Sequence, residues 1–446
     1  MSARQPLETE KGAYGSLPDD VTKAAVAKRW DWAVILWIVM VGDMARGILF
    51  PTLWPLVSSL GGDKVTQGFT VAAFSFGRAI SSPLWGQFSN MKGYKVPLIF
   101  SKCTTAVGAI LYIRADSIFT LILSQICIGF GSGSLGVTRS WVAANSSKSE
   151  RTTAMATLSA MQFFGFTVTP FFGSALSLAC INTSVAPIPF LPWFVITKFT
   201  SPAYVICFAC FIGILALFTV FTEPAQDGLP QTKSANTLED GEEEVPPNTC
   251  GCEGSAYALY MGLILNLVTR GVIGSFEAMG TSLAPQYGFD ATDAGFIVSI
   301  FGLVGTAQLL FFVCYTSRFK DTQLILAGLF AMLLACIVMV HGERINLSSE
   351  VCYVIAILSI YACGYPVGNT SALGLFSKAA GSQPQGLLMG IFGSAGAGAR
   401  IVFPILAGTI VQYLGSNVLF IILAICTLVT ILFTQCGKKT LDIVTG

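Results

Sequence analysis

The sequence predicts an all-α membrane protein with twelve transmembrane helices in two pseudo-symmetric six-helix bundles. The first observation is composition, because 53% of the 446 residues are hydrophobic and only 11% are charged, and the mean hydropathy is +0.70. Soluble globular domains do not have this balance. The second is that apolar runs of about 20 residues, the length that crosses a bilayer as a helix, recur along the chain. The third is an internal repeat, which indicates two related halves.

Twelve apolar segments supply the predicted spans, and an even number places both chain ends on one side of the membrane. Lysine and arginine concentrate in the tails and loops of that side, which identifies it as cytosolic by the positive-inside rule. In chain order the predicted spans are 31–57, 66–89, 96–114, 117–143, 152–180, 201–222, 256–286, 291–316, 321–341, 350–377, 384–413 and 416–436.

Five regions follow from these spans. The connector between the halves is acidic and poor in apolar residues, so we expect a linker that does not form a packed core. The regions are a cytosolic N-terminal tail at 1–29, an N-terminal bundle at 30–222, an acidic cytosolic linker at 223–255, a C-terminal bundle at 256–436 and a cytosolic C-terminal tail at 437–446. No cleavable signal peptide is recognisable before the first span, which we expect to direct insertion itself.

The internal repeat relates the first predicted helix to the seventh and the fifth to the eleventh. Asp43 and Glu277 are separated by the same number of residues as Pro170 and Pro404. A shared offset across two helix pairs is expected when two bundles derive from one structural repeat.

Charged residues lie deep inside several of these apolar spans. A charge at that depth costs several kcal/mol unless it is paired or hydrated, and it therefore marks a polar pathway. Alternating-access carriers bind their ligand at the depth where these residues are expected. We assign six such residues to a substrate-binding site: Arg46, Arg78, Arg270, Arg400, Asp43 and Glu277.

The pattern leaves two interpretations of these charges open. In a structural one the acids and arginines neutralise each other and hold the two halves in register. Asp43 can then pair with Arg46 on the same helical face, and Glu277 with Arg270. In a functional one the excess of arginine binds an anion, because the planar guanidinium suits carboxylate, phosphate or sulfate. We favour an anionic solute, with the buried carboxylates as candidate proton carriers.

Composition and motifs argue against other functional classes. The net charge of +1 comes without a basic face, so we expect no nucleic-acid partner. We find no metal-ligand cluster, nucleotide-binding loop or nucleophile–base pair, and therefore predict no metal, no cofactor and no enzymatic activity. The expected partners are a small solute, protons and membrane lipid, and the expected state is a monomer.

The loop after the second predicted helix, from Gly86 to Lys95, resembles the cytosolic signature loop of the major facilitator superfamily. Asn90 stands where that family usually has an aspartate. The resemblance implies that this loop controls the closure of the helix ends. We assign gating to Asn90, Lys92, Lys95 and Arg139.

Two longer stretches narrow the resemblance. Motifs around Arg139-Ser140, Gly364-Tyr365-Pro366 and Gly398-Ala399-Arg400 are similar to the lysosomal subfamily named for a neuronal ceroid lipofuscinosis. This resemblance implies a secondary transporter of an endolysosomal or vacuolar membrane that moves a small anionic solute. Three alternatives stay open: a chloride-channel-like conductance in the same fold, a phosphate transporter, and a location in the plasma membrane.

Short motifs add two expectations. Tyr14 and Leu17 form a tyrosine-based endosomal sorting signal. Asn182 and Asn346 begin glycosylation sequons in loops that the predicted topology places outside the cytosol.

Overall fold

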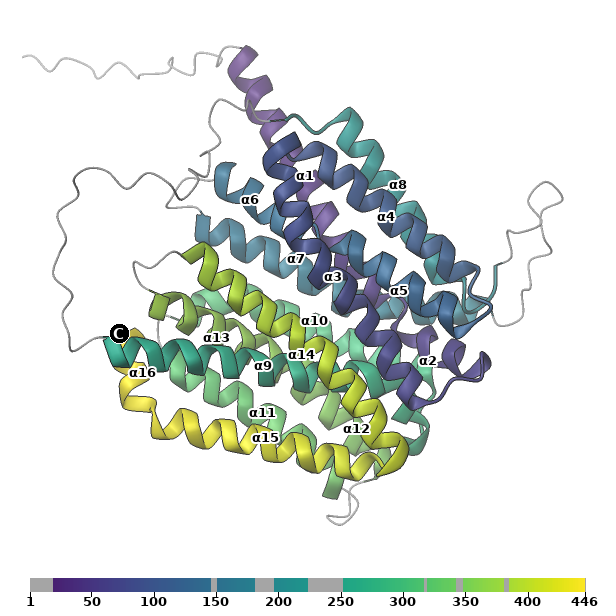
Figure 1. The fold of residues 1–446 in the computed structure, drawn as a ribbon, viewed down its shortest axis with the longest axis vertical. Coiled ribbons are helices and arrows are strands. Elements are labelled where there is room, and N and C mark those ends of the chain that lie inside the picture. The colour runs from purple at the N-terminus through teal and green to yellow at the C-terminus, as the bar shows by residue number, and fades with distance from the viewer. Residues whose placement is uncertain are drawn as a thin grey trace, which may run out of the picture.

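A computed structural model describes residues 19–145, 151–180, 196–223, 252–316, 319–341, 348–380 and 385–445. The regular secondary structure in these ranges is entirely helical, so the predicted all-α class is confirmed. The helices form two groups that lie side by side (Figure 1).

The first group comes from the N-terminal half of the chain. Its helices are α1 (Asp19–Gly47), α2 (Phe50–Ser59), α3 (Lys64–Lys92), α4 (Lys95–Ile113), α5 (Ile118–Ser132), α6 (Leu135–Asn145), α7 (Arg151–Ala179) and α8 (Ser201–Thr219).

The second group comes from the C-terminal half. It contains α9 (Cys252–Leu283), the 3₁₀ turn η2 (Ala284–Tyr287), α10 (Ala291–Thr316), α11 (Asp321–His341), α12 (Ser349–Leu358), the π-helical turn η4 (Ser359–Gly364), α13 (Tyr365–Ala380), α14 (Gln385–Tyr413), α15 (Ser416–Cys436) and α16 (Lys438–Thr445).

Ten segments of the described residues are long and apolar enough to cross a membrane. Two further helices, α3 and α7, have 29 residues each but are not apolar enough to meet the same criterion. Together they are consistent with the predicted twelve spans. The two less apolar helices are also those that pack most extensively against the other group, α3 on α14 and α7 on α10.

Three predicted spans are discontinuous. The first breaks between α1 and α2, where a proline in the first turn of α2 favours a new helix start. The fourth breaks between α5 and α6 at Gly133, where a side chain would collide with Ser81. The tenth contains η4, and π-helical turns of this kind often occur at functional sites. Each break exposes backbone groups inside the membrane, which is tolerated where protein or a cavity surrounds them.

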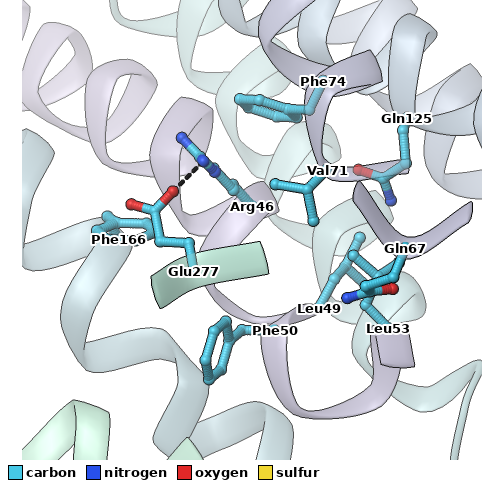
Figure 2. Close-up of a pocket in the computed structure, with 10 residues that line it drawn as sticks. All are labelled: Arg46, Leu49, Phe50, Leu53, Gln67, Val71, Phe74, Gln125, Phe166 and Glu277. Carbon is cyan, nitrogen blue, oxygen red and sulfur yellow. Dashed lines mark hydrogen bonds and ion pairs between the residues drawn. The ribbon is translucent and has the colours of Figure 1, made fainter. Parts of the chain in front are cut away.

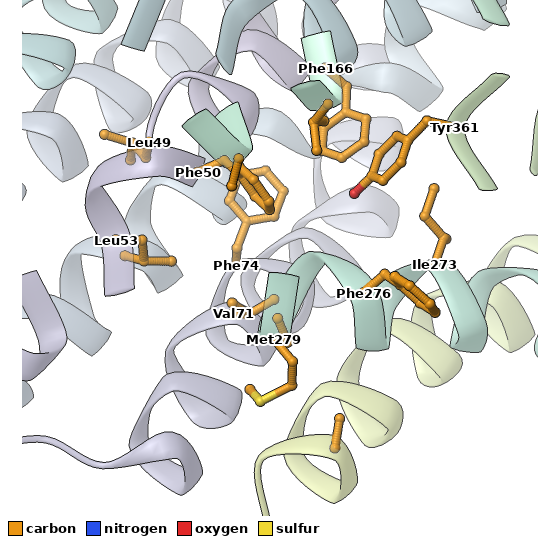
Figure 3. Close-up of a cluster of buried hydrophobic side chains, with 14 of the residues drawn as sticks. Leu49, Phe50, Leu53, Val71, Phe74, Phe166, Ile273, Phe276, Met279 and Tyr361 are labelled. Carbon is orange, nitrogen blue, oxygen red and sulfur yellow. The ribbon is translucent and has the colours of Figure 1, made fainter. Parts of the chain in front are cut away.

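A hydrophobic cluster joins the two bundles. Phe74 and Phe166 of the N-terminal bundle lie near Phe276, Met279 and Tyr361 of the C-terminal bundle (Figure 3). These side chains are buried. Separate clusters occupy the interior of each bundle.

Among the described residues, α3 and α14 of the two bundles approach closely at one of their ends. A Cβ atom at Gly68 of α3 would collide with the Pro404 carbonyl oxygen of α14, and one at Gly408 would collide with the Lys64 carbonyl oxygen. We call this the far end. At the other end of the same helices, a Cβ at Gly86 or at Gly393 would meet nothing within 4 Å.

The end of α3 and α14 that contains Gly86 and Gly393 is called the terminal end. The ribbon agrees, because α3 and α14 meet where α3 begins and separate toward its last turn (Figure 1). The bundles are therefore closed at the far end and separated at the terminal end.

Both chain ends contain helix where the sequence predicted tails. Helix α1 begins at Asp19, although the apolar run starts at Trp30. Helix α16 packs Leu441 fully into the C-terminal bundle, and Asp442 accepts hydrogen bonds from Thr322 and from Lys320, the latter at 3.1 Å. The acidic linker lies outside the described residues, apart from Glu223 and residues 252–255 at its two edges, so its extent stays a prediction.

Candidate functional site

Glu277 lies between two arginines that come from different bundles. Arg46, at the end of α1, forms an ion pair with Glu277 of α9 (Figure 2). On the same carboxylate, Oε1 is 3.5 Å from Arg400 Nη2 of α14. Arg400 also donates to the Tyr365 hydroxyl at 3.3 Å. We call Arg46, Glu277 and Arg400 the cross-bundle cluster.

Aromatic rings enclose this cluster. The Arg46 guanidinium lies 5.5 Å from the ring centres of both Phe74 and Phe166, and that of Arg400 lies 5.9 Å from Phe166. Cation–π contacts stabilise a guanidinium while excluding water from it. Phe166 of α7 therefore contributes to holding both arginines.

The end of α1 explains the position of Arg46. The helix stops at Gly47, where a side chain would collide with the Phe166 carbonyl oxygen and the Thr169 hydroxyl. Arg46 thus occupies the last turn, where the carbonyl groups of a helix end favour a positive charge. The helix break places a cation at the bundle interface.

Asp43 and Arg78 form a second charged group within the N-terminal bundle. Arg78 of α3 donates to both carboxylate oxygens of Asp43, at 2.8 and 2.9 Å. Its Nε lies 3.4 Å from the carbonyl oxygen of Ser132, the last residue of α5. This two-point geometry is the strong form of an arginine–carboxylate pair.

Lys102 of α4 belongs to the same region and was not identified from the sequence. Its side chain is fully buried, and its Nζ donates to the Ile38 carbonyl oxygen at 3.1 Å. The signal was available, because Lys102 lies inside the predicted span 96–114 as the arginines lie inside theirs. Asp43 therefore has two cations near it, Arg78 and Lys102.

Arg270 of α9 differs from the other three arginines assigned to the substrate site, Arg46, Arg78 and Arg400, because it has no carboxylate partner among the described residues. Among the described residues no acidic group lies within ion-pair distance of it, and its Nε is 3.4 Å from Asn369 Oδ1. Its side chain packs over Gly396, where a Cβ would collide with it. Arg270 therefore adds uncompensated positive charge.

The structure corrects the predicted pairing along each helix. Asp43 binds Arg78 and not Arg46, because the guanidinium of Arg78 takes both carboxylate oxygens. Glu277 binds Arg46 and Arg400 and not Arg270, because its side chain points across the interface. Both carboxylates have partners from other helices.

A small pocket lies on the far side of the cross-bundle cluster. Its volume of about 30 Å³ is enough to hold a water molecule. Arg46, Glu277, Gln67 and Gln125 line it together with apolar side chains (Figure 2). Several buried polar atoms here have no hydrogen-bond partner in the described protein: Arg46 Nη1, Arg400 Nε, Glu277 Oε1, Gln67 Oε1 and Gln125 Nε2. The site therefore has unused hydrogen-bonding capacity for a polar ligand.

Exposure of the cationic side chains increases toward the terminal end. The exposed fraction is 8% for Arg46, 11% for Arg400 and 17% for Arg78. Arg139 is exposed, while Arg270 and Arg78 are still among its electrostatic neighbours. The cationic region is thus reached from the terminal end.

The predicted gating loop is held by its own bundle. Asn90 and Lys92 are exposed at the terminal end. The Glu223 carboxylate, just after α8, accepts hydrogen bonds from the backbone N–H groups of Tyr94 and of Lys95, the latter at 3.1 Å. Burial and this carboxylate raise the pKa of the Tyr94 hydroxyl. Glu223 was not identified from the sequence.

The remaining predicted residues lie outside the described ranges. These are Tyr14 and Leu17 of the sorting signal and Asn182 and Asn346 of the sequons. Within the described ranges, no group of three or more His, Cys, Asp or Glu side chains is placed to hold a metal ion.

Comparison with known proteins places this geometry in context. Residues 35–246 and 259–437 match the family model described as Major Facilitator Superfamily. The chain is 27% identical to the Major facilitator superfamily domain-containing protein 8 of Xenopus laevis, over 89% of this chain and 88% of that protein. It is 21% identical to Multidrug resistance protein 1 of Bacillus subtilis, over 66% and 68% of the two chains.

Solved structures share the fold at low sequence identity. The nucleoside transporter NupG matches with a TM-score of 0.68 and 14% identity, over 91% of this chain and 99% of that one. A bacterial homologue of the human lysosomal transporter Spinster, solved in an inward-facing and unoccupied conformation, matches with a TM-score of 0.60 and 13% identity, over 94% and 97%.

The human organic anion transporter MFSD10 matches with a TM-score of 0.58 and 16% identity, over 92% and 99%. Because the family model spans most of both helical halves, this chain, a multi-pass membrane protein, belongs to the major facilitator superfamily.

Proposed function

We propose that the protein is a secondary active transporter that moves a small anionic solute across an endolysosomal or vacuolar membrane, coupled to protons. The observation that carries this proposal is the cross-bundle cluster. Two arginines from opposite bundles share the single carboxylate of Glu277. A group that bridges both bundles at this depth is where an alternating-access carrier holds its solute.

Charge supports an anion over a neutral or cationic solute. In and around the cross-bundle cluster, five cationic side chains outnumber two carboxylates. The cations are Arg46, Arg78, Arg270, Arg400 and Lys102, and the carboxylates are Asp43 and Glu277. The excess of cations repels a cationic solute, and the unpartnered N–H groups of Arg46 and Arg400 are donors that an anion can accept from.

Glu277 then acts as an internal competitor of the solute. Its carboxylate occupies the position between Arg46 and Arg400 while the site is empty. An entering anion takes over one or both guanidinium groups and frees Glu277. Release of Glu277 weakens the contact between the bundles. Contacts between the solute and both bundles replace the lost ion pairs while the bundles move relative to each other.

The conformation fits one half of such a cycle. The bundles are closed at the far end and separated at the terminal end. With the terminal end in the cytosol, as the lysine and arginine distribution predicts, this is an inward-open state. The relative solved in an inward-facing conformation supports this assignment.

Two likenesses support the proposed membrane. The sequence motifs resemble a lysosomal subfamily of the superfamily, and one structural relative is a homologue of a lysosomal transporter. A second relative is described as an organic anion transporter, which agrees with the anionic class.

Uptake by proteoliposomes tests the proposal. The full-length purified protein is supplied with labelled chloride, phosphate, sulfate and lactate, and with glucose and choline as neutral and cationic solutes, with and without a pH gradient. We expect saturable uptake and counterflow for at least one anion and none for glucose or choline. Preference for glucose or choline would contradict the proposal.

Variants connect the flux to the cluster. Arg46→Gln and Arg400→Gln should reduce anion uptake to the level of empty liposomes, while Arg114→Gln, at an exposed loop position, should leave it unchanged. Full activity in both variants would show that the cross-bundle cluster is not the anion-binding site. Non-saturating chloride conductance without counterflow would instead identify a channel.

A further inference from the structure

Lys102 is a fully buried cationic side chain that the proposed anion site does not use. It lies within the span Lys95–Ile113, and none of its side chain is exposed. Ionisable groups inside a transmembrane segment are rare, and they usually serve the function and have an identifiable partner. Lys102 has three N–H donors when charged, and the acceptor found for it is the Ile38 carbonyl oxygen at 3.1 Å.

A slot between α1 and α5 receives the amine. Gly42 has no side chain, and a Cβ built there would lie 3.9 Å from Lys102 Nζ and 3.8 Å from Ser132 Cβ. Any larger residue at position 42 would narrow this space. The slot therefore holds the amine beside Asp43, the next residue of α1.

The ionisable neighbours of Lys102 come from three helices. Cys210 of α8, Arg78 of α3 and Asp43 of α1 all interact with it electrostatically. The neighbouring residue of α5, Ser132, is neutral. The local charge is thus set by Asp43, Arg78 and Lys102.

We propose that Lys102 is the proton-binding site that couples proton movement to anion binding. With Lys102 neutral, the three groups sum to zero, because Arg78 balances Asp43. With Lys102 protonated, they carry one positive charge behind the anion site. A bound anion then favours protonation of Lys102, and protonation favours the anion to the same extent, because linkage is reciprocal.

This assignment replaces the carboxylates as proton carriers. Asp43 and Glu277 already have guanidinium partners, whereas Lys102 is held by a single carbonyl oxygen. The proposal rests on the proposed function for its anion, but proton binding by Lys102 can be measured without one.

Burial limits how a proton reaches Lys102. Lys102 is enclosed, whereas the Arg78 side chain, which pairs with Asp43, is 17% exposed. We expect the proton to enter from the space between the bundles, past the Asp43–Arg78 pair. Protonation then forms an N–H bond on the lone pair of Lys102 Nζ, and the Asp43–Arg78 pair stays intact.

Proton titration of the substrate-free protein is the first test. Purified full-length wild type, Lys102→Met and Lys102→Arg are titrated in weak buffer between pH 5 and 9. Wild type should bind about one proton more across this range than either variant, since methionine binds none and arginine keeps its own. Lys198→Met, at an exposed position, is the matched control and should titrate as wild type does.

Identical titration of wild type and both variants would overturn the proposal and leave Lys102 as a fixed structural cation. If Lys102→Met does not fold, Lys102→Arg decides, because it retains the charge and a donor for Ile38. This result stands even if no anion in the panel is transported.

Uptake driven by a pH gradient is the second test, with the anion that wild type takes up best. Lys102→Arg should bind and exchange the anion while losing the acceleration by the gradient. An acceleration equal to that of wild type would overturn the coupling role. Absence of uptake by wild type itself would count against the proposed function, and the titration would still decide proton binding.

Discussion

The two buried carboxylates occupy equivalent positions in the repeat, yet their ion pairs differ in kind. Asp43 binds Arg78 within one bundle, through two hydrogen bonds of 2.8 and 2.9 Å. Glu277 binds Arg46 of the other bundle and has Arg400 of its own bundle 3.5 Å away. The first pair can persist while the bundles move, whereas the second must change whenever they separate.

This difference assigns separate tasks to equivalent positions. A within-bundle pair keeps α1 and α3 together and sets the charge near Lys102. The ion pairs of the cross-bundle cluster, in contrast, can change when a solute binds between the bundles. The comparison predicts that changes at Asp43 affect folding first, and that changes at the interface affect transport first.

The largest effect on stability is expected for Asp43→Asn. It leaves Arg78 and the fully buried Lys102 without a carboxylate. Removing one partner of a buried ion pair costs about 3–5 kcal/mol. Thermal or denaturant unfolding of the purified protein measures this loss of stability. Asp63→Asn at the exposed start of α3 is the control and should cost less than about 0.5 kcal/mol, because asparagine caps a helix about as well as aspartate. A loss no greater than this control would mean that Asp43 is not the structural member of the comparison.

Closure of the interface is tested by two glycines of α3. Gly68→Leu places atoms against the Pro404 carbonyl oxygen and should open the far end, while Gly86→Leu meets open space and should leave the present state intact. Both should lower transport, because each blocks closure of one end. The distance between spin labels at the exposed positions Asp63 and Tyr413 should lengthen only in Gly68→Leu.

Equal label distances in wild type and Gly68→Leu would contradict the closed far end. A longer distance in Gly86→Leu would contradict the separated terminal end.

A moderate effect within one bundle is expected for Glu223→Gln. The carboxylate accepts from the first N–H groups of α4, next to Gly93, whose φ of +75° is in the left-handed region. Loss of a charged acceptor at a helix start costs about 1 kcal/mol. Thermal unfolding should shift accordingly, while Asp116→Asn in an exposed loop should change nothing. An unchanged melting temperature would show that Glu223 does not hold the loop.

The smallest effect is a pH dependence at α16. Hydrogen bonding from Thr322 and the Lys320 ammonium lower the pKa of Asp442 below its ordinary value of 3.8. Because its pKa is lowered, the Asp442 carboxylate stabilises the packing of α16 on the C-terminal bundle above about pH 4. This contribution is lost as the pH falls through the pKa of Asp442 in the folded protein. The hydrogen-exchange protection of residues 438–445, corrected for the intrinsic pH dependence of amide exchange, should therefore fall only below about pH 4, and Asp442→Asn should remove this dependence. A loss of protection already at about pH 6 would contradict the assignment.

Much of the fold could be predicted from the sequence because membrane spans have a minimum apolar length. The predicted span 66–89 became α3 (Lys64–Lys92), and 416–436 became α15 with the same bounds. The breaks inside spans could not be predicted in this way. They depend on close contacts such as that of Gly133 with Ser81, which join residues distant in sequence.

The candidate site was predicted in part for the same reason. A charge inside an apolar run identified Arg46 and Glu277, but their pairing joins residues 231 positions apart and depends on how two bundles meet. Helical spacing favoured Arg46 as the ion-pair partner of Asp43, whereas in the folded protein its partner is Arg78 from another helix. Lys102 satisfies the same criterion, but its place near Asp43 and Arg78 depends on how α4 packs against α1 and α3, which the sequence does not show.

The central claim is that Glu277 occupies the place of the transported anion between Arg46 and Arg400. Its most direct test is the affinity of Glu277→Gln for the anion that wild type transports best, measured as the dissociation constant of the purified protein. Because the substitution removes a competing charge, we expect binding to tighten at least about tenfold, equivalent to about 1.4 kcal/mol. An affinity equal to or weaker than that of wild type would contradict the claim.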